Sequence, residues 1–201
     1  STAGLAINTS TGVITPASST PGNYTVTYSI TGTGGCPTVS SSTTVEIGTQ
    51  PAQPTLISGP TAVCENSNGN SFTIAAVAKA SSYIWTLPTG WTINSGDGTT
   101  SIVATAGNYL QSGIISVAAA NSCGTSTAQV VEVAVDQMPT AFAIDGDATI
   151  CYNNTADIVL ASSQTGMSYQ LKKQSDGTNV GSPVSGTGGM LILNTGALTS
   201  S

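Results

Sequence analysis

The four cysteines of the chain recur at a fixed interval. Cys36 and Cys123 are 87 positions apart, and so are Cys64 and Cys151. The flanking sequence follows the same interval, because residues 57–66 resemble residues 144–153. Solenoid repeats are about 20 to 50 residues long, whereas one β-sandwich domain takes about 100 residues. The interval therefore predicts tandem sandwich domains.

This interval divides the 201 residues into three parts. We expect residues 1–50 to be the C-terminal half of one immunoglobulin-like domain, residues 51–137 a complete domain, and residues 138–201 the N-terminal part of a third. A Pro-containing connector follows each of the first two parts, at 50–54 and 137–139. We expect the array to continue in both directions.

Apolar and polar residues alternate along most of the chain, which is typical of half-buried β-strands. Tyr24, Val26, Tyr28 and Ile30 are one example. In the middle part the expected strands are a short one ending at Cys64 and the segments 71–77, 82–87, 101–105, 113–120 and 127–135. No segment shows a sustained helical period. The pattern predicts an all-β fold of tandem immunoglobulin-like antiparallel β-sandwiches.

The cysteines also suggest a disulfide. Cys64 lies in the first strand of the middle domain and Cys123 lies in its last hairpin, so we expect both at the same end of the sandwich and predict a Cys64–Cys123 bond. Closing the intervening loop of 59 residues (123 − 64) would stabilise the domain by about 4 kcal/mol. Cys36 and Cys151 would pair outside residues 1–201. The alternative is that all four are reduced core thiols. Disulfides imply an oxidising, extracellular setting.

The charge balance excludes several classes of partner. The chain has three Lys, no Arg, no His and nine acidic residues, giving a net charge of −6. Nucleic acids and anionic membranes require clustered cations, which are absent. No apolar run approaches the roughly 20 residues of a membrane span. We therefore predict no nucleic-acid binding and no membrane insertion.

Catalysis is not predicted either. Without histidine, the chain has no Ser-His-Asp or Cys-His arrangement and no histidine-containing zinc site. The acidic residues stand singly in expected strands or connectors. We predict that the protein is not an enzyme and has no organic cofactor.

Asp136, Asp145 and Asp147 gather around the second connector and are candidate calcium ligands, because calcium prefers oxygen-rich, flexible sites. The first connector has no matching acids, so ordinary solvated turn residues are the alternative.

The two tryptophans receive different predictions. Trp85 alternates with Tyr83 and Leu87, which predicts the core tryptophan of a sandwich. Trp91 follows Pro88-Thr89-Gly90, and we consider it both for contact with a glycan and for packing against the sheet edge.

Several segments resemble a known family. The segments Tyr83–Trp91 and Asn121–Gly124 resemble the PKD-like (polycystic-kidney-disease-like) immunoglobulin-fold domains of secreted Bacteroidota proteins. Residues 4–28 and 164–184 resemble modules that accompany such domains. The acidic Trp-Asp-Phe-Gly-Asp-Gly motif of the parent domain is replaced here by Ile84–Pro88, so no function of that motif is carried over.

The resemblance implies a large cell-surface protein, exported by the type IX secretion system and used in adhesion or gliding motility. We expect a structural and adhesive repeat segment that acts as a stalk or filament outside the cell. Its expected partners are neighbouring domains of the same chain, surface polysaccharide, or other copies in a filament. The alternative is a glycan-binding or spacer module of a secreted multidomain hydrolase.

Overall fold

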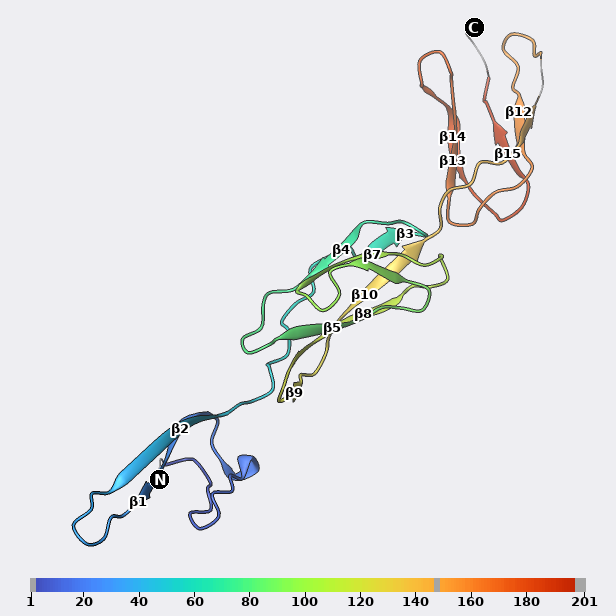
Figure 1. The fold of residues 1–201 in the computed structure, drawn as a ribbon. Helices are drawn as coiled ribbons and strands as arrows, with labels where there is room; N and C mark the ends of the chain where they lie inside the picture. The colour runs from blue at the N-terminus through green and yellow to red at the C-terminus, as the bar shows by residue number, and fades with distance from the viewer. Residues whose placement is uncertain (1–2, 147–148, 198–201) are drawn as a thin grey trace. The chain divides into compact units, whose positions relative to one another are not determined.

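The computed structural model describes residues 3–146 and 149–197 and divides the chain into two compact units, residues 1–136 and 137–201. In these described ranges every regular element is a β-strand, apart from one 3-10 turn, η1 (Pro16–Ser18) (Figure 1). No helix in the described part of the chain is long and apolar enough to cross a membrane. The predicted all-β fold is confirmed.

The first unit begins with a long hairpin. Strands β1 (Gly22–Ile30) and β2 (Val39–Ile47) pair antiparallel over all nine residues, from Gly22 opposite Ile47 to Ile30 opposite Val39. The alternation seen from Tyr24 to Ile30 therefore does mark a strand. Tyr24 and Ile47 are buried, but the apolar residues toward the hairpin tip are exposed.

The rest of the first unit is a two-sheet sandwich. One sheet has the order β3-β10-β8-β5, with β9 also paired to β8, and the other has the order β4-β7-β6. Strand β3 runs parallel to β10, whereas the other pairs are antiparallel. Apart from β3, which pairs with β10, the division of strands between the two sheets is that of immunoglobulin domains. The bounds are β3 (Ala62–Cys64), β4 (Asn70–Thr73), β5 (Ser82–Thr86), β6 (Thr92–Ser95), β7 (Ser101–Thr105), β8 (Gly113–Asn121), β9 (Gly124–Thr125) and β10 (Gln129–Asp136).

Alternate residues of both sheets fill the core. Its largest fully buried members come from one sheet (Phe72, Ile102) and from the other (Ile115, Val117, Val133). Trp85 of β5 belongs to the same cluster, and its indole Nε1 donates a hydrogen bond of 2.9 Å to the carbonyl oxygen of Thr99. Its predicted role as the core tryptophan is confirmed.

The second unit contains two small sheets. One joins β11 (Ile144–Gly146), β12 (Asp157–Leu160) and β15 (Leu191–Asn194), and the other pairs β13 (Ser168–Lys172) with β14 (Asn179–Ser185). Leucines from the first sheet pack with apolar side chains of the second, namely Leu160, Leu191 and Leu193 with Tyr169, Leu171 and Val184. This unit therefore has a core of its own.

Candidate functional site

The cysteines do not form the predicted disulfide. All four are exposed free thiols. Cys64 is aligned with Asp136 at the C-terminal end of β10, and that end of β10 lies beside Gly113, the first residue of β8. Cys123 instead follows Asn121, the last residue of β8. Eight steps along a strand span about 27 Å, whereas a disulfide needs Cα atoms about 4.4 to 6.8 Å apart.

The Cys64–Cys123 prediction is therefore wrong, because the two residues lie at opposite ends of the sandwich (Figure 1, where β3 and β9 mark those ends). The pairing of Cys36 and Cys151 with cysteines outside residues 1–201 was deduced from this bond and loses its basis with it. The alternative of core thiols is also wrong, since all four side chains are exposed.

Trp91 is a core residue. Only 7% of its surface is exposed, its ring lies 6.4 Å from the ring of Phe72, and its Nε1 donates a 2.9 Å hydrogen bond to the carbonyl oxygen of Gln111. A sugar ring needs an open aromatic face, and Trp91 offers none. The prediction of a glycan contact at Trp91 is therefore wrong, and the packing alternative describes its position.

The acidic residues near the second connector are divided between the units. Asp136 ends β10 in the first unit, and Asp145 lies in β11 of the second, where its carboxylate accepts the Gly146 N–H at 2.8 Å. Asp147 lies outside the described residues. Within residues 3–146 and 149–197, no three His, Cys, Asp or Glu side chains are grouped to hold a metal. The calcium site stays a prediction.

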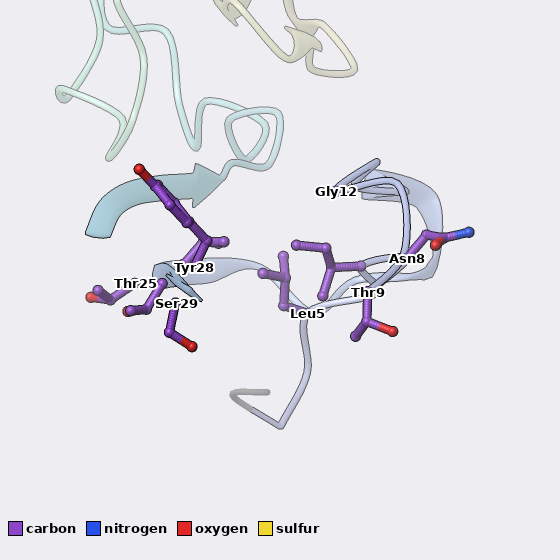
Figure 2. Close-up of a pocket in the computed structure, with 10 residues that line it drawn as sticks. Leu5, Asn8, Thr9, Gly12, Thr25, Tyr28 and Ser29 are labelled. Atoms are coloured by element: carbon purple, nitrogen blue, oxygen red, sulfur yellow. The ribbon is translucent and has the colours of Figure 1, made fainter. Parts of the chain in front are cut away.

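The first unit contains a groove of about 690 Å³ beside β1. Residues 25–29 of β1 form one side, and Leu5, Ile7, Asn8, Thr9 and Gly12 contribute the remainder. Figure 2 shows Leu5 between the β1 residues Thr25, Tyr28 and Ser29 and the loop residues Asn8 and Thr9. No pattern in the sequence predicted this groove.

The groove has an uncharged lining and lies along an unpaired strand edge. Its lining is apolar (Leu5, Ile7, Val26, Tyr28) or bears hydroxyl and amide groups, and it has no charged side chain. Among the described strands β1 pairs only with β2, so its other edge has no strand partner. An unpaired edge next to apolar side chains suits an extended peptide.

A second, smaller hollow lies where the first connector joins the sandwich. Asn121 is one of its lining residues, and its Nδ2 donates to the carbonyl oxygens of Thr49 and Lys79, at 2.8 and 3.0 Å. Pro51 and Pro54 of the connector are buried. The connector is thus attached to the sandwich by side-chain hydrogen bonds and by packing.

The sandwich of the first unit is similar to a known domain family. Residues 50–133 match the PKD-like domain family. The match begins in the first connector and ends inside β10, so it spans the strands of both sheets. The comparison with curated proteins gave no significant match. Residues 50–133 are thus similar to the PKD-like domain family, and we refer to this sandwich below as the PKD-like domain.

Proposed function

We propose that this chain is a structural and adhesive repeat segment of a large secreted bacterial surface protein, and that it serves as part of a stalk or filament. The proposal is best supported by strand positions and hydrogen bonds on both sides of the PKD-like domain that parallel those inside it.

On the C-terminal side, strand positions recur at the interval set by the cysteines. Strand β12 lies 87 residues after β4, and β13 lies 86 residues after β5. A hydrogen bond recurs as well. The Tyr83 hydroxyl accepts the Val77 N–H at 2.8 Å, and the Tyr169 hydroxyl accepts the Gln164 N–H at 2.7 Å. These parallels support a third domain that begins near residue 138.

On the N-terminal side, the hairpin β1–β2 parallels β8–β10. Both β1 and β8 have nine residues and begin with glycine, and Gly22 opposes Ile47 as Gly113 opposes Val133. The hydroxyl of Tyr24 donates a 2.7 Å hydrogen bond to the carbonyl oxygen of Thr20. Immunoglobulin domains make such a bond at the start of the strand that corresponds to β8. This supports the C-terminal half of a domain in residues 1–50.

The connectors are hydrogen-bonded to the domains that follow them. In the second unit the buried side chain of Gln164 donates to the Met138 carbonyl oxygen at 3.0 Å and accepts the Thr140 N–H at 2.6 Å. The first connector is held through Asn121, as described above. Each connector is thus bound to the domain that follows it, as suits a spacer.

The cellular setting is part of the proposal. Extracellular location, type IX export and a role in adhesion or gliding rest on the resemblance to secreted Bacteroidota domains. The sparsely charged sequence, with 6% charged residues, suits an extracellular β-protein. We also propose that the segment is not catalytic. The glycan-binding alternative has lost its sugar-stacking candidate, because Trp91 is buried.

The proposal is tested by deleting residues 51–137 from the full-length protein in the bacterium that produces it. We expect the protein to remain on the cell surface while immunogold labels on its distal part move closer to the cell. The matched control replaces residues 51–137 with an unrelated immunoglobulin-like domain of similar length, which should restore the distance. An unchanged distance, or an antigen found only inside cells, would refute the proposal.

A further inference from the structure

We propose that Asn68 is a site of spontaneous covalent modification, at which the side-chain amide is lost and an aspartate or an isoaspartate is formed. The site lies in the loop that joins β3 to β4 of the PKD-like domain. The reaction needs no enzyme and no co-reactant other than water. The inference is independent of the proposed function, because it depends only on the chemistry and contacts of this loop.

Asn68 is the only asparagine in the sequence that is followed by glycine. The reaction begins when the backbone nitrogen of the following residue attacks the side-chain carbonyl carbon of the asparagine, and a side chain on that residue crowds the attack. Glycine has no side chain and adopts a wider range of backbone angles than other residues. The space around Gly69 is also open, since a Cβ built on it would meet no described atom within 4 Å beyond its chain neighbours.

The two reacting groups are free of hydrogen bonds. Asn68 and Gly69 are both exposed and lie in no strand or turn, because β4 starts only at Asn70. Among the described residues, none accepts a hydrogen bond from the Gly69 N–H and none binds the Asn68 side chain. The attack therefore does not require a strand or a turn to open first.

The next asparagine in the chain differs in both respects. Asn70 precedes Ser71, whose side chain crowds the attacking nitrogen. The side-chain nitrogen of Asn70 donates to the carbonyl oxygens of Ser67 and Ala104, at 2.9 and 3.3 Å, so its amide is held in place. Of these two neighbouring amides, only that of Asn68 is free to react.

The atoms of the reaction balance with water alone. A base from the solvent removes the amide proton of Gly69, the backbone nitrogen bonds to Cγ of Asn68, and Nδ2 leaves with one added proton as ammonia. The product is a five-membered succinimide ring. Water then opens the ring on either side of its nitrogen. Opening at Cγ gives aspartate with a normal backbone, whereas opening at the backbone carbonyl carbon gives isoaspartate, in which the backbone passes through Cγ.

Isoaspartate adds one carbon to the backbone between two residues that are fixed. The carbonyl oxygen of Ser67 accepts the Ala106 N–H at 2.9 Å, and Asn70 pairs with Ala104 in the sheet. A longer chain between Ser67 and Asn70 should weaken the hydrogen bond that joins them. Either product also adds one negative charge to the net charge of −6. Modified and unmodified chains should therefore separate on an anion exchanger.

The test incubates the folded chain at mildly alkaline pH and follows each asparagine by peptide mapping with mass spectrometry. Loss of the amide raises the mass of a peptide by about 1 Da, and a protein isoaspartyl methyltransferase labels the isoaspartate. Asn70 in the same loop is the matched internal control. We expect the initial rate at Asn68 to exceed that at Asn70 by about tenfold or more, because Gly69 lacks the side chain that Ser71 carries.

Two comparisons separate the effect of the fold from that of the sequence. The rate at Asn68 in the folded chain should lie within about threefold of its rate in guanidinium chloride, since no protecting structure has to open. Asn68→Gln keeps an amide but would have to close a six-membered ring, so the new charged form should disappear from the anion exchanger. Equal rates at Asn68 and Asn70, a folded rate far below the unfolded rate, or an unchanged charged form in Asn68→Gln overturns the inference.

Discussion

The side-chain nitrogen of Asn121 lies 2.8 Å from the carbonyl oxygen of Thr49, which precedes it by 72 residues. The same nitrogen donates to the carbonyl oxygen of Lys79, and the side-chain oxygen accepts the Cys123 N–H at 2.8 Å. One amide thus holds the connector, the loop before β5 and the turn after β8.

Asn121→Asp should destabilise the PKD-like domain, because a carboxylate has no N–H to donate and would face two carbonyl oxygens. We expect a loss of about 1 to 3 kcal/mol in the free energy of unfolding. Urea titration followed by tryptophan fluorescence measures this domain alone, since both tryptophans lie within it. The control is Asn94→Asp: the Asn94 side-chain oxygen accepts the Thr105 hydroxyl at 2.9 Å, and a carboxylate preserves that bond. Equal stability of the two variants would contradict the role of Asn121.

Because the four thiols are free, we expect the melting temperature to be independent of a reductant. A bond closing a 59-residue loop would add about 4 kcal/mol, so its reduction would lower the melting temperature by roughly 15 to 30 °C. We expect the melting temperature to stay within about 1 °C when dithiothreitol is added, since there is no bond to reduce. Titration of the native protein with a thiol reagent should detect all four cysteines without denaturant. Fewer than four reactive thiols in the folded protein would count against the structure.

The buried position of Trp91 predicts a graded response to substitution. Trp91→Phe keeps most of the ring but leaves the Gln111 carbonyl oxygen without its 2.9 Å donor, which should cost about 1 to 3 kcal/mol. Trp91→Ala also opens a cavity beside Phe72 and should cost about 3 to 5 kcal/mol. Urea unfolding, followed through the fluorescence of Trp85, measures both. Two substitutions without effect would mean that Trp91 is exposed in solution.

Asp176 in the loop between β13 and β14 should titrate at an unusually low pH. Hydrogen bonds from the Thr178 hydroxyl, at 2.7 Å, and from the Thr178 N–H, at 2.9 Å, stabilise its carboxylate and lower its pKa below the ordinary 3.8. A lowered folded pKa means that any stabilisation is present above pH 3.8 and is lost as the pH falls through the lowered value. The ionisation of Asp176 should therefore not make the stability depend on pH near neutrality.

Carbon-detected NMR titration of the Asp176 carboxylate measures this pKa. Thr178→Val removes the hydroxyl donor and should raise the pKa toward its ordinary value. Ser175→Ala in the same loop keeps Thr178 and should leave the pKa low. If both variants titrate alike, the hydroxyl is not the main cause of the shift.

Periodicity predicted most of the strands. The alternation around Trp85 and Val117 marked β5 and β8, since one face of each strand is buried and the other is solvated. Strand β6 was missed because Ile93 is its only apolar residue and turn-forming residues follow it. The expected strand 71–77 is shorter in the structure. Strand β4 ends at Thr73, and the alanine-rich stretch that follows lies outside the sheet and includes Lys79 with a positive φ of 65°.

The site predictions depended on contacts that periodicity does not encode. The position of Cys64 follows from the parallel pairing of β3 with β10, and a strand of three residues carries no sequence signal for its direction. The burial of Trp91 depends on Phe72 and Gln111, which are 19 and 20 residues away in sequence. The groove beside β1 brings residues 5–12 together with residues 25–29, and alternation along the chain does not encode that contact.

The parallel pairing of β3 with β10 determines how the PKD-like domain would respond to tension. Ala62, Val63 and Cys64 lie beside Ala134, Val135 and Asp136. A pull on the two ends of the domain drags these strands past each other along their length, because the chain enters before β3 and leaves after β10. Their hydrogen bonds are then loaded together in shear and must break at once, whereas an antiparallel terminal pair would unzip one bond at a time. A short strand thereby becomes the clamp that resists extension.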